Sequence, residues 1–139
     1  MKTIAKILLT LSLALCGGLS LGAQNQKIDK KNLVIKEWNT DAKSNAKFLD
    51  HVTTYNADGQ KLEESEYYSD GSIKWRERYE YGPNGKIAKT LVYDGRNKLV
   101  NIKKYEYNEF NRRKTAYTYD AKGRLKTIKV FEYLTQNAE

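Results

Sequence analysis

Histidine and cysteine are nearly absent from this 139-residue sequence, which contains one of each, His51 and Cys16. A zinc site needs several such side chains, so the sequence excludes one. Cys16 falls in the signal peptide expected below, so the exported chain would keep no cysteine for a cysteine–histidine dyad. Residues 24–139 contain no Gly-x-Ser-x-Gly segment for a serine nucleophile, and their glycines stand singly instead of forming a phosphate-binding loop. We therefore expect no catalytic residue, no metal site and no cofactor.

Carboxylates are the remaining route to catalysis, because a pair of them can hydrolyse a glycoside. Glu77 is the best candidate, since it falls between Trp75 and Tyr79. We expect it instead to pair with Lys89 or Lys103 on the same face of a sheet. A glycan-active hydrolase is accordingly the last of three functions that we consider.

Long apolar runs are missing too, apart from Ile7 to Leu15. Lys2 and Lys6 precede this run and small residues follow it, which is typical of a signal peptide over residues 1–23, cleaved after Ala23. The run is shorter than the roughly 20 residues of a membrane span. We expect an exported protein of the periplasm or cell surface, with no transmembrane segment after cleavage.

Cys16 leaves open a second interpretation, a lipoprotein signal in which the acylated cysteine becomes the first residue. Such signals usually have glycine, alanine or serine before the cysteine, where Leu15 stands here. Cleavage after Ala23 would remove the only cysteine, so the exported domain would have no disulfide. We divide the rest of the chain into a flexible N-terminal segment, residues 24–32, and a tyrosine-rich β-repeat domain, residues 33–139.

Internal repetition is the strongest feature of the sequence. Three blocks of 26 residues align without a gap, beginning at Tyr55, Tyr81 and Tyr107, and each ends in an aromatic residue followed by glutamate. Each block has two related halves, because a further tyrosine stands 12 residues after the block begins. Four residues after each of these six tyrosines stands a glycine or an asparagine: Gly59, Gly71, Gly85, Asn97, Asn111 and Gly123.

This half-unit predicts a β-hairpin. Glycine and asparagine best tolerate the left-handed backbone that a type I turn followed by a G1 bulge requires. The tyrosine then lies opposite the residue six positions later, as Tyr119 opposite Leu125 or Tyr107 opposite Arg113. Asn45 stands where an earlier turn is expected, so the pattern begins before the first complete block.

The turns leave eight candidate strands and no segment with sustained helical periodicity. We expect the strands near residues 33–40, 46–55, 61–68, 73–81, 86–93, 98–107, 112–119 and 124–133. The predicted fold is all-β, an antiparallel meander of seven to eight strands that forms a coiled single sheet or a small up-and-down barrel.

Even spacings between the tyrosines predict that the aromatic residues share one face, because side chains alternate between the two faces of a strand. Ten of the eleven tyrosines are odd-numbered, and Trp75 and Phe131 join them. We expect most of these rings to form the core, because burial of large rings is needed to offset the entropy of the chain. No helix is available to cover this face, so the sheet must coil, close or dimerise.

The even-numbered face is expected to be a solvated surface with cross-strand ion pairs. The expected pairs are Glu64 with Arg76, Glu66 with Lys74, Glu106 with Lys114 and Glu132 with Arg112. An apolar stripe interrupts this surface, and we interpret it as a site covered by residues 33–35 or as a partner surface. The stripe consists of Val92, Val100, Ile102, Ala116, Ile128 and Val130.

The leading hypothesis is an exported, non-enzymatic binding or interaction module of the bacterial envelope. Its expected ligand face mixes aromatic and charged side chains, which suit a glycan, a peptide or an anionic envelope polymer. These residues are Trp75, Glu77, Lys89, Tyr93, Lys103, Tyr105 and Tyr117. The alternative is a purely structural protein whose tyrosines are only core, and a homodimer is open in either case. We expect no nucleic acid, because the basic residues are dispersed.

The segment Tyr117-Thr-Tyr-Asp-Ala-Lys-Gly-Arg-Leu125 resembles the YD repeat of RHS and related wall-forming proteins. Tyr93-Asp94 and Tyr55-Asn56 are weaker copies of it. Those proteins build β shells from long arrays, whereas the few double units of this chain suffice only for a small domain.

The chain is also similar to a family of small exported proteins of gut Bacteroides that is grouped as a domain of unknown function. Members share a short signal ending in Ala-Gln, here Ala23-Gln24, and tyrosine-rich repeats with scattered tryptophan, here Trp38 and Trp75. This resemblance implies an exported protein of a Gram-negative bacterium, and it brings no known activity or site residue.

Overall fold

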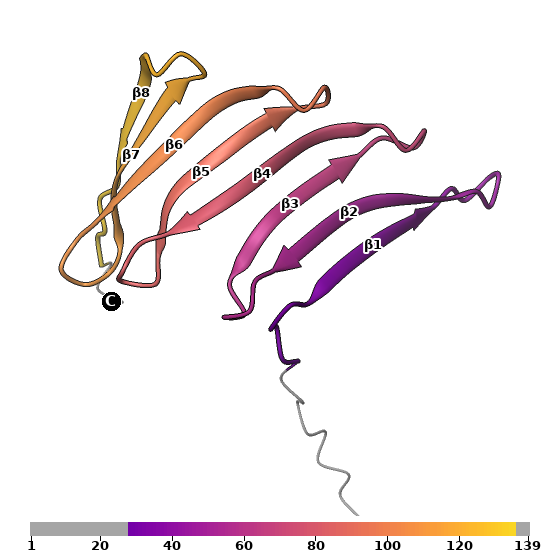
Figure 1. The fold of residues 1–139 in the computed structure, drawn as a ribbon, viewed down its shortest axis with the longest axis horizontal. Helices are drawn as coiled ribbons and strands as arrows, with labels where there is room; N and C mark the ends of the chain where they lie inside the picture. Colours follow the sequence, from indigo (N-terminus) through magenta and orange to yellow (C-terminus); the bar gives the residue numbers. More distant parts are fainter. Residues whose placement is uncertain (1–27, 136–139) are drawn as a thin grey trace, which may run out of the picture.

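The computed structural model describes residues 28–135, which form one eight-stranded antiparallel sheet (Figure 1). Each strand pairs with its neighbours along the chain, so the order across the sheet is the order in the sequence. The strands are β1 (Val34–Thr40), β2 (Lys47–Tyr55), β3 (Lys61–Tyr67), β4 (Ile73–Tyr81), β5 (Ile87–Asp94), β6 (Leu99–Tyr107), β7 (Arg113–Asp120) and β8 (Leu125–Val130). The all-β meander is therefore confirmed. The expected signal peptide, residues 1–23, lies outside the described residues.

The sheet is open and coiled. Within residues 28–135, β1 and β8 form the two edges and do not pair with each other. The sheet twists along its width, so that β7 and β8 are turned away from the plane of β1 and β2 (Figure 1). Of the two expected forms, the coiled single sheet is the one observed.

Glycine and asparagine make the turns, as the half-unit predicts. All six of the predicted residues have a positive φ, from 57° at Asn111 to 85° at Gly71, and so does Asn45, at 56°. In each of the six hairpins the tyrosine lies opposite the residue six positions later, as Tyr119 opposite Leu125. The sequence rule for the turns is confirmed.

Aspartate or asparagine recurs directly after the tyrosine because its side chain accepts hydrogen bonds from the turn. Asp120 Oδ1 accepts hydrogen bonds from the backbone N–H groups of Lys122 and Arg124, both at 2.9 Å. Asn56, Asp94 and Asn108 accept two such bonds in their own turns. Short polar side chains at this position satisfy turn amides that have no strand partner, so these residues serve the turn.

A second irregularity overturns the expectation of a single aromatic face. In each of the six hairpins the pairing slips by one residue next to the tyrosine: Tyr119 pairs with Leu125, but Thr118 pairs with Thr127. A slip of one residue exchanges the two faces of the second strand. The extra residues are Leu62, Lys74, Ala88, Val100, Lys114 and Lys126.

Aromatic residues consequently occupy both faces of the sheet. We call face A the face that carries Trp75, Tyr79 and Tyr105, and face B the face that carries Tyr93 and Tyr117. The tyrosines before the turns at one end of the sheet, Tyr55, Tyr81 and Tyr107, lie on face A, whereas Tyr67, Tyr93 and Tyr119, before the turns at the other end, lie on face B. The prediction that odd-numbered aromatics share one face is wrong.

The slips also change the expected cross-strand pairs. The observed pairs are Glu64 with Glu77, Glu66 with Trp75 and Glu106 with Thr115. Lys74 still reaches Glu66, with 2.6 Å between Nζ and Oε1, so this ion pair is confirmed. Arg112 stacks over the ring of Tyr133, 5.4 Å from its centroid, instead of pairing with Glu132. The pairs predicted for Glu64 and Glu106 are wrong because each register is one residue off.

The sheet is a single layer in residues 28–135, and no hydrophobic side chain among them is buried. The buried side chains carry hydroxyl groups: Thr53, Ser65, Thr90 and Thr115. Most tyrosines are half-buried along the sheet. The expectation that the tyrosines form a buried core is therefore wrong for the described residues, since no second layer covers either face.

Three tyrosine hydroxyls instead tie β4 to β3, β6 to β5, and the segment after β8 to β7. These hydrogen bonds run from Tyr81 to the Lys61 carbonyl oxygen at 2.8 Å, from Tyr107 to that of Ile87 at 2.8 Å, and from Tyr133 to that of Arg113 at 2.7 Å. The donors stand 26 residues apart and so do the acceptors, so the sequence repeat is also a repeat of this hydrogen bond.

Candidate functional site

The seven residues of the expected ligand face divide between the two faces of the sheet. Trp75, Glu77, Lys103 and Tyr105 lie on face A, and Lys89, Tyr93 and Tyr117 lie on face B. The slips in register cause this division, because each slip exchanges the faces of the following strand. The structure therefore does not bring the seven residues together as one site.

The centre of face A holds a network of carboxylates and their hydrogen-bond donors across β3, β4 and β6. The Tyr79 hydroxyl contacts the carboxylate of Glu64 and, at 3.1 Å, that of Glu77. Lys103 Nζ lies 3.0 Å from Glu77 Oε1, and Lys61 Nζ lies 2.6 Å from Glu64 Oε1. Glu77 thus pairs with Lys103, one of the two lysines expected for it.

These contacts favour the ionised form of Glu64. Burial alone would raise the pKa of Glu64, but the hydrogen bonds from Lys61 and Tyr79 outweigh burial and lower this pKa below its ordinary value. Burial and the hydrogen bond to Glu64 raise the pKa of Tyr79, so the phenol stays neutral and remains a donor. A general acid needs a raised pKa, so Glu64 suits a structural anion better than an acid catalyst.

Trp75 is fixed in the sheet beside this network. Its Nε1 donates to Glu66 Oε2 at 2.5 Å, and Lys74 Nζ donates to the other oxygen of the same carboxylate at 2.6 Å. The His51 ring meets the indole edge-on, with 5.9 Å between the ring centroids. Because Trp75 is engaged on several sides and half-buried, it packs as part of the scaffold rather than as an open platform for a ligand.

A shallow groove of about 250 Å³ lies further along face A, over β6, β7 and β8. Three cationic side chains and two aromatic rings line it together with two threonines and an alanine, and no carboxylate does so. The lining residues are Lys103, Tyr105, Arg113, Ala116, Thr118, Thr127, Lys129 and Phe131. Two of the expected ligand residues, Lys103 and Tyr105, therefore belong to one concave site.

Arg113 is held between the two rings of the groove. Its guanidinium carbon lies 4.0 Å from the centroid of Tyr105 and 5.9 Å from that of Phe131. Stacking on ring faces leaves the N–H groups at the edge of the guanidinium plane able to bind an anion. Among residues 28–135, Arg113 and Lys129 form no ion pair, whereas Lys103 is partly neutralised by its carboxylate partner.

Sequence reasoning found Lys103 and Tyr105 but missed the other cations of the groove. Arg113 lies opposite Tyr107, where the hairpin rule puts it. The preceding block has an isoleucine at this position, so the change to arginine was a signal that the sequence offered. Lys129 reaches face A only because Lys126 is an extra residue in the last hairpin, and no side-chain type marks such a position.

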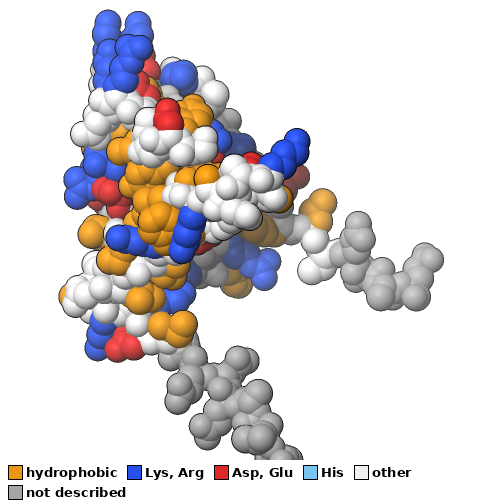
Figure 2. Space-filling view, turned by 90° about the vertical axis from the view of Figure 1, so that its right-hand side faces the viewer, with side chains coloured by type: hydrophobic (Ala, Val, Ile, Leu, Met, Phe, Trp, Pro, Cys, Tyr) orange, Lys and Arg blue, Asp and Glu red, His pale blue; other side chains and the backbone are white. Residues whose placement is uncertain are grey.

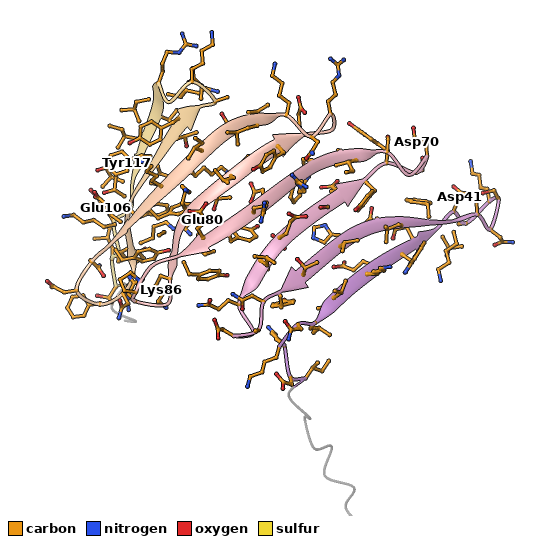
Figure 3. All side chains as sticks on the ribbon, in the orientation of Figure 1. Asp41, Asp70, Glu80, Lys86, Glu106 and Tyr117 are labelled. Atoms are coloured by element: carbon orange, nitrogen blue, oxygen red, sulfur yellow. The ribbon has the colours of Figure 1, made fainter. Side chains whose placement is uncertain are left out.

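The expected ligand residues on face B are engaged with their neighbours. Lys89 Nζ lies 2.6 Å from Glu80 Oε2, and an arginine guanidinium covers the Tyr93 ring, 4.5 Å from its centroid. The Tyr117 hydroxyl donates to Glu106 Oε2 at 3.2 Å, and these two residues lie together in Figure 3. Face B thus has fewer free polar groups for a ligand than the groove on face A.

The expected apolar stripe does not form one surface. Val92 lies on face A, Val100 is the extra residue of its hairpin, and Ile102 lies on face B. Ile128 and Val130 also lie on face B, at the β8 edge, where they are 56% and 67% exposed. The prediction of a continuous stripe across four strands is wrong, and its exposed part is confined to β8.

Residues 28–135 contain no group of three or more histidine, cysteine, aspartate or glutamate side chains that could hold a metal ion. The same segment has no helix of the length and apolarity that a membrane span requires. Comparison of the chain with protein-family models, with curated proteins and with solved structures finds no match. A functional proposal therefore rests on the groove of face A.

Proposed function

We propose that this chain is an exported, non-enzymatic binding module that binds an acidic polysaccharide in the groove over β6, β7 and β8. The observation that carries the proposal is the convergence of three cations and two aromatic rings in a groove to which no carboxylate contributes. Binding sites are typically concave, with an apolar lining and a few polar groups that orient the ligand.

Charge favours an anionic ligand. Arg113 offers a planar set of donors that matches a carboxylate with two parallel hydrogen bonds, and Lys129 adds a second cation. The sequence has a formal net charge of +8, of which only Lys2 and Lys6 belong to the expected signal peptide, so the exported chain keeps a positive charge that attracts anionic polymers at long range. A uronic acid, whose sugar ring bears a carboxylate, meets these requirements.

The other lining residues favour a sugar. Arg113 covers one face of the Tyr105 ring, and the ring of Phe131 presents apolar surface against which the C–H face of a sugar ring can pack. The hydroxyl groups of Thr118 and Thr127 both donate and accept hydrogen bonds, as sugar hydroxyls do. Because the sheet has no second layer in residues 28–135, a polymer can extend past the groove on either side.

Titration of the chain with polygalacturonate tests the proposal. Isothermal calorimetry at low salt is expected to show binding that weakens as the ionic strength rises, whereas neutral dextran should give no heat of binding. Dextran sulfate is the control for charge, because it is anionic but has no uronic acid. If it binds as tightly as polygalacturonate, the attraction depends on charge alone. The absence of polygalacturonate binding would contradict the proposal and favour a purely structural repeat protein.

Catalysis is not part of the proposal. Glu77, the best catalytic candidate, is ion-paired with Lys103, and its cross-strand partner Glu64 has a lowered pKa that is unsuited to a general acid. Assay against a panel of glycans is expected to show no turnover. Turnover that disappears in Glu77→Gln would contradict this part of the account.

Export is a separate part of the proposal. It is supported by the signal-like residues 1–23 and by the resemblance to exported Bacteroides proteins. Mass spectrometry of the chain recovered from its producing cell is expected to find Gln24 as the first residue. Recovery of a chain that retains residues 1–23 would contradict export by this route.

A further inference from the structure

The two edges of the sheet carry exposed apolar side chains. On β1, Val34 and Trp38 are 52% and 50% exposed, and on β8, Ile128 and Val130 are 56% and 67% exposed. Figure 1 places these strands at opposite ends of the sheet, and Figure 2, seen from the β1 side, shows hydrophobic side chains at the surface among lysines and arginines. An edge strand with an unpaired backbone can pair with another chain unless it is covered.

Three of the four strand pairs in the sheet are copies of one two-strand unit. The register slips and the tyrosine-to-carbonyl hydrogen bonds recur every 26 residues, so β3–β4, β5–β6 and β7–β8 are copies of one unit. β1–β2 precedes these units as a fourth antiparallel pair, with its register slip between Glu37 and Trp38 rather than next to the turn. Each unit begins with an odd-numbered strand. A strand that continued the sheet after β8 would therefore correspond to β3, β5 or β7, and β1 is the odd-numbered strand with a free edge.

We propose that the β8 edge of one copy of this chain pairs with the β1 edge of a second copy, so that the sheet continues from copy to copy. This pairing joins two different edges, so each added copy presents a fresh edge and the assembly stays open. It goes beyond the binding function proposed above, because it joins two copies of the chain through the edges of β1 and β8, although β8 also contributes Thr127 and Lys129 to the groove.

The internal repeats fix the register of this junction. Lys36 of β1 pairs with Val52, and Lys89 of β5 pairs with Lys104. Val52 and Lys104 stand two 26-residue repeats apart, so Lys36 occupies in β1 the place that Lys89 occupies in β5. β1 has no extra residue between Val34 and Lys36, so the neighbour of Lys36 on face A is Ile35, which pairs with Thr53.

Charge complementarity supports the junction. Glu80 pairs with Lys89 across β4 and β5, with 2.6 Å between Oε2 and Nζ (Glu80 is labelled in Figure 3). Glu132 stands two repeats after Glu80, so at the junction it meets Lys36 of the second copy. Glu132 and Lys36 are both exposed, and neither forms an ion pair with another described residue.

An apolar pair forms at the same junction. Tyr81 lies opposite Ile87 where β4 meets β5. Two repeats later the corresponding residue is Tyr133, whose hydroxyl already makes the hydrogen bond to the preceding strand that Tyr81 makes. With Glu132 opposite Lys36, Tyr133 lies opposite Ile35 of the second copy, which is on face A as Tyr81 is. This contact covers two side chains that are 47% and 38% exposed in the single chain.

Sedimentation of the full chain over a wide concentration range tests the proposal. We expect the mean mass to rise with concentration and to pass that of a dimer. Lys36→Glu and Glu132→Lys each place like charges at the junction and are expected to weaken association about 10-fold. An equimolar mixture of the two variants restores opposite charges at every junction between unlike copies, so it should associate as the unmodified chain does.

Lys43→Glu is the matched control, because Lys43 is exposed in the turn between β1 and β2 and changes the net charge equally. It should leave association unchanged. A chain that stays monomeric throughout, or a mixture of Lys36→Glu and Glu132→Lys that fails to recover association, would overturn the proposal. A mass that stops at a dimer and is insensitive to Glu132→Lys would overturn it in favour of pairing between two β1 edges. Polysaccharide titration at dilute protein tests the groove independently of this result.

Discussion

Glu64 and Glu77 are direct partners across β3 and β4 on face A. Like charges at directly opposed positions destabilise a sheet, yet here the Tyr79 hydroxyl contacts both carboxylates, and Lys61 and Lys103 each bind one of them. These hydrogen-bond donors offset the repulsion between the two carboxylates, and Tyr79 is the donor that both carboxylates share.

Removal of the Tyr79 hydroxyl should therefore destabilise the sheet. Tyr79→Phe is expected to lower the free energy of unfolding by about 1–3 kcal/mol, because it removes a donor to two charged acceptors. Urea unfolding at pH 7 measures the effect. Tyr68→Phe is the control, since Tyr68 is 51% exposed, and a change as large in this variant would contradict a specific role for the Tyr79 hydroxyl.

Acid should weaken the same network. The pKa of Glu64 is lowered in the folded chain, because hydrogen bonds from Lys61 and Tyr79 outweigh its burial. Glu64 therefore contributes stability above its unfolded pKa of about 4.3, and this contribution is lost as the pH falls through the lower, folded value. The urea midpoint should drop less between pH 7 and pH 3 in Glu64→Gln than in the unmodified chain. An equal drop in both proteins would show that Glu64 is not linked to stability.

Trp75 and Trp38 provide a matched pair of tryptophans on the sheet. Trp75 is half-buried and hydrogen-bonded to Glu66, whereas Trp38 is 50% exposed on the edge strand β1. Trp75→Ala is expected to cost about 2–3 kcal/mol, toward the lower end of large-to-small substitutions because the site is only partly buried, and Trp38→Ala less than about 1 kcal/mol. Affinity of the folded Trp75→Ala for polygalacturonate should be unchanged, and a selective loss of binding with full stability would place the ligand at Trp75.

Gly95 lies against the backbone of the neighbouring hairpin. A Cβ at this position would collide with the carbonyl oxygen of Ile73, and backbone cannot move aside as a flexible side chain can. Gly95→Ala is therefore expected to destabilise the chain by about 1–3 kcal/mol. Thermal unfolding compares it with Arg96→Ala at the next, exposed position, and equal stability of the two variants would contradict the collision.

The sequence was sufficient to predict the fold, because the turns have a chemical signature. Gly71, Asn97 and the other four turn residues need a left-handed backbone, which few residue types tolerate. Their spacing predicted the strand order, the six tyrosine-to-partner pairs and the strand bounds to within one residue, except that β8 ends at Val130 and not near residue 133. Asp120 and its equivalents add hydrogen bonds to the turn amides, which gives the recurring Tyr-Asp pair a structural reason.

The faces of the sheet were not predictable in the same way. The extra residue of each hairpin is an aliphatic side chain in some cases, such as Leu62 and Val100, and a lysine in others, such as Lys126. No side-chain type is required there, so the sequence offers no signal for the slip. The face on which each residue lies depends on these one-residue slips. The expected ligand residues therefore fell on two faces, and Lys129 was not predicted to line the groove.

The central claim is that the groove on face A binds an acidic polysaccharide through Arg113, and calorimetry of Arg113→Gln with polygalacturonate tests it most directly. Arg96→Gln removes the same charge from an exposed turn and is the matched control. We expect Arg113→Gln to lower the affinity roughly 10- to 100-fold, because it removes hydrogen bonds between two charged groups. Arg96→Gln is expected to bind as the unmodified chain does. Equal losses in the two variants would contradict the claim, because they would show attraction by net charge without a site.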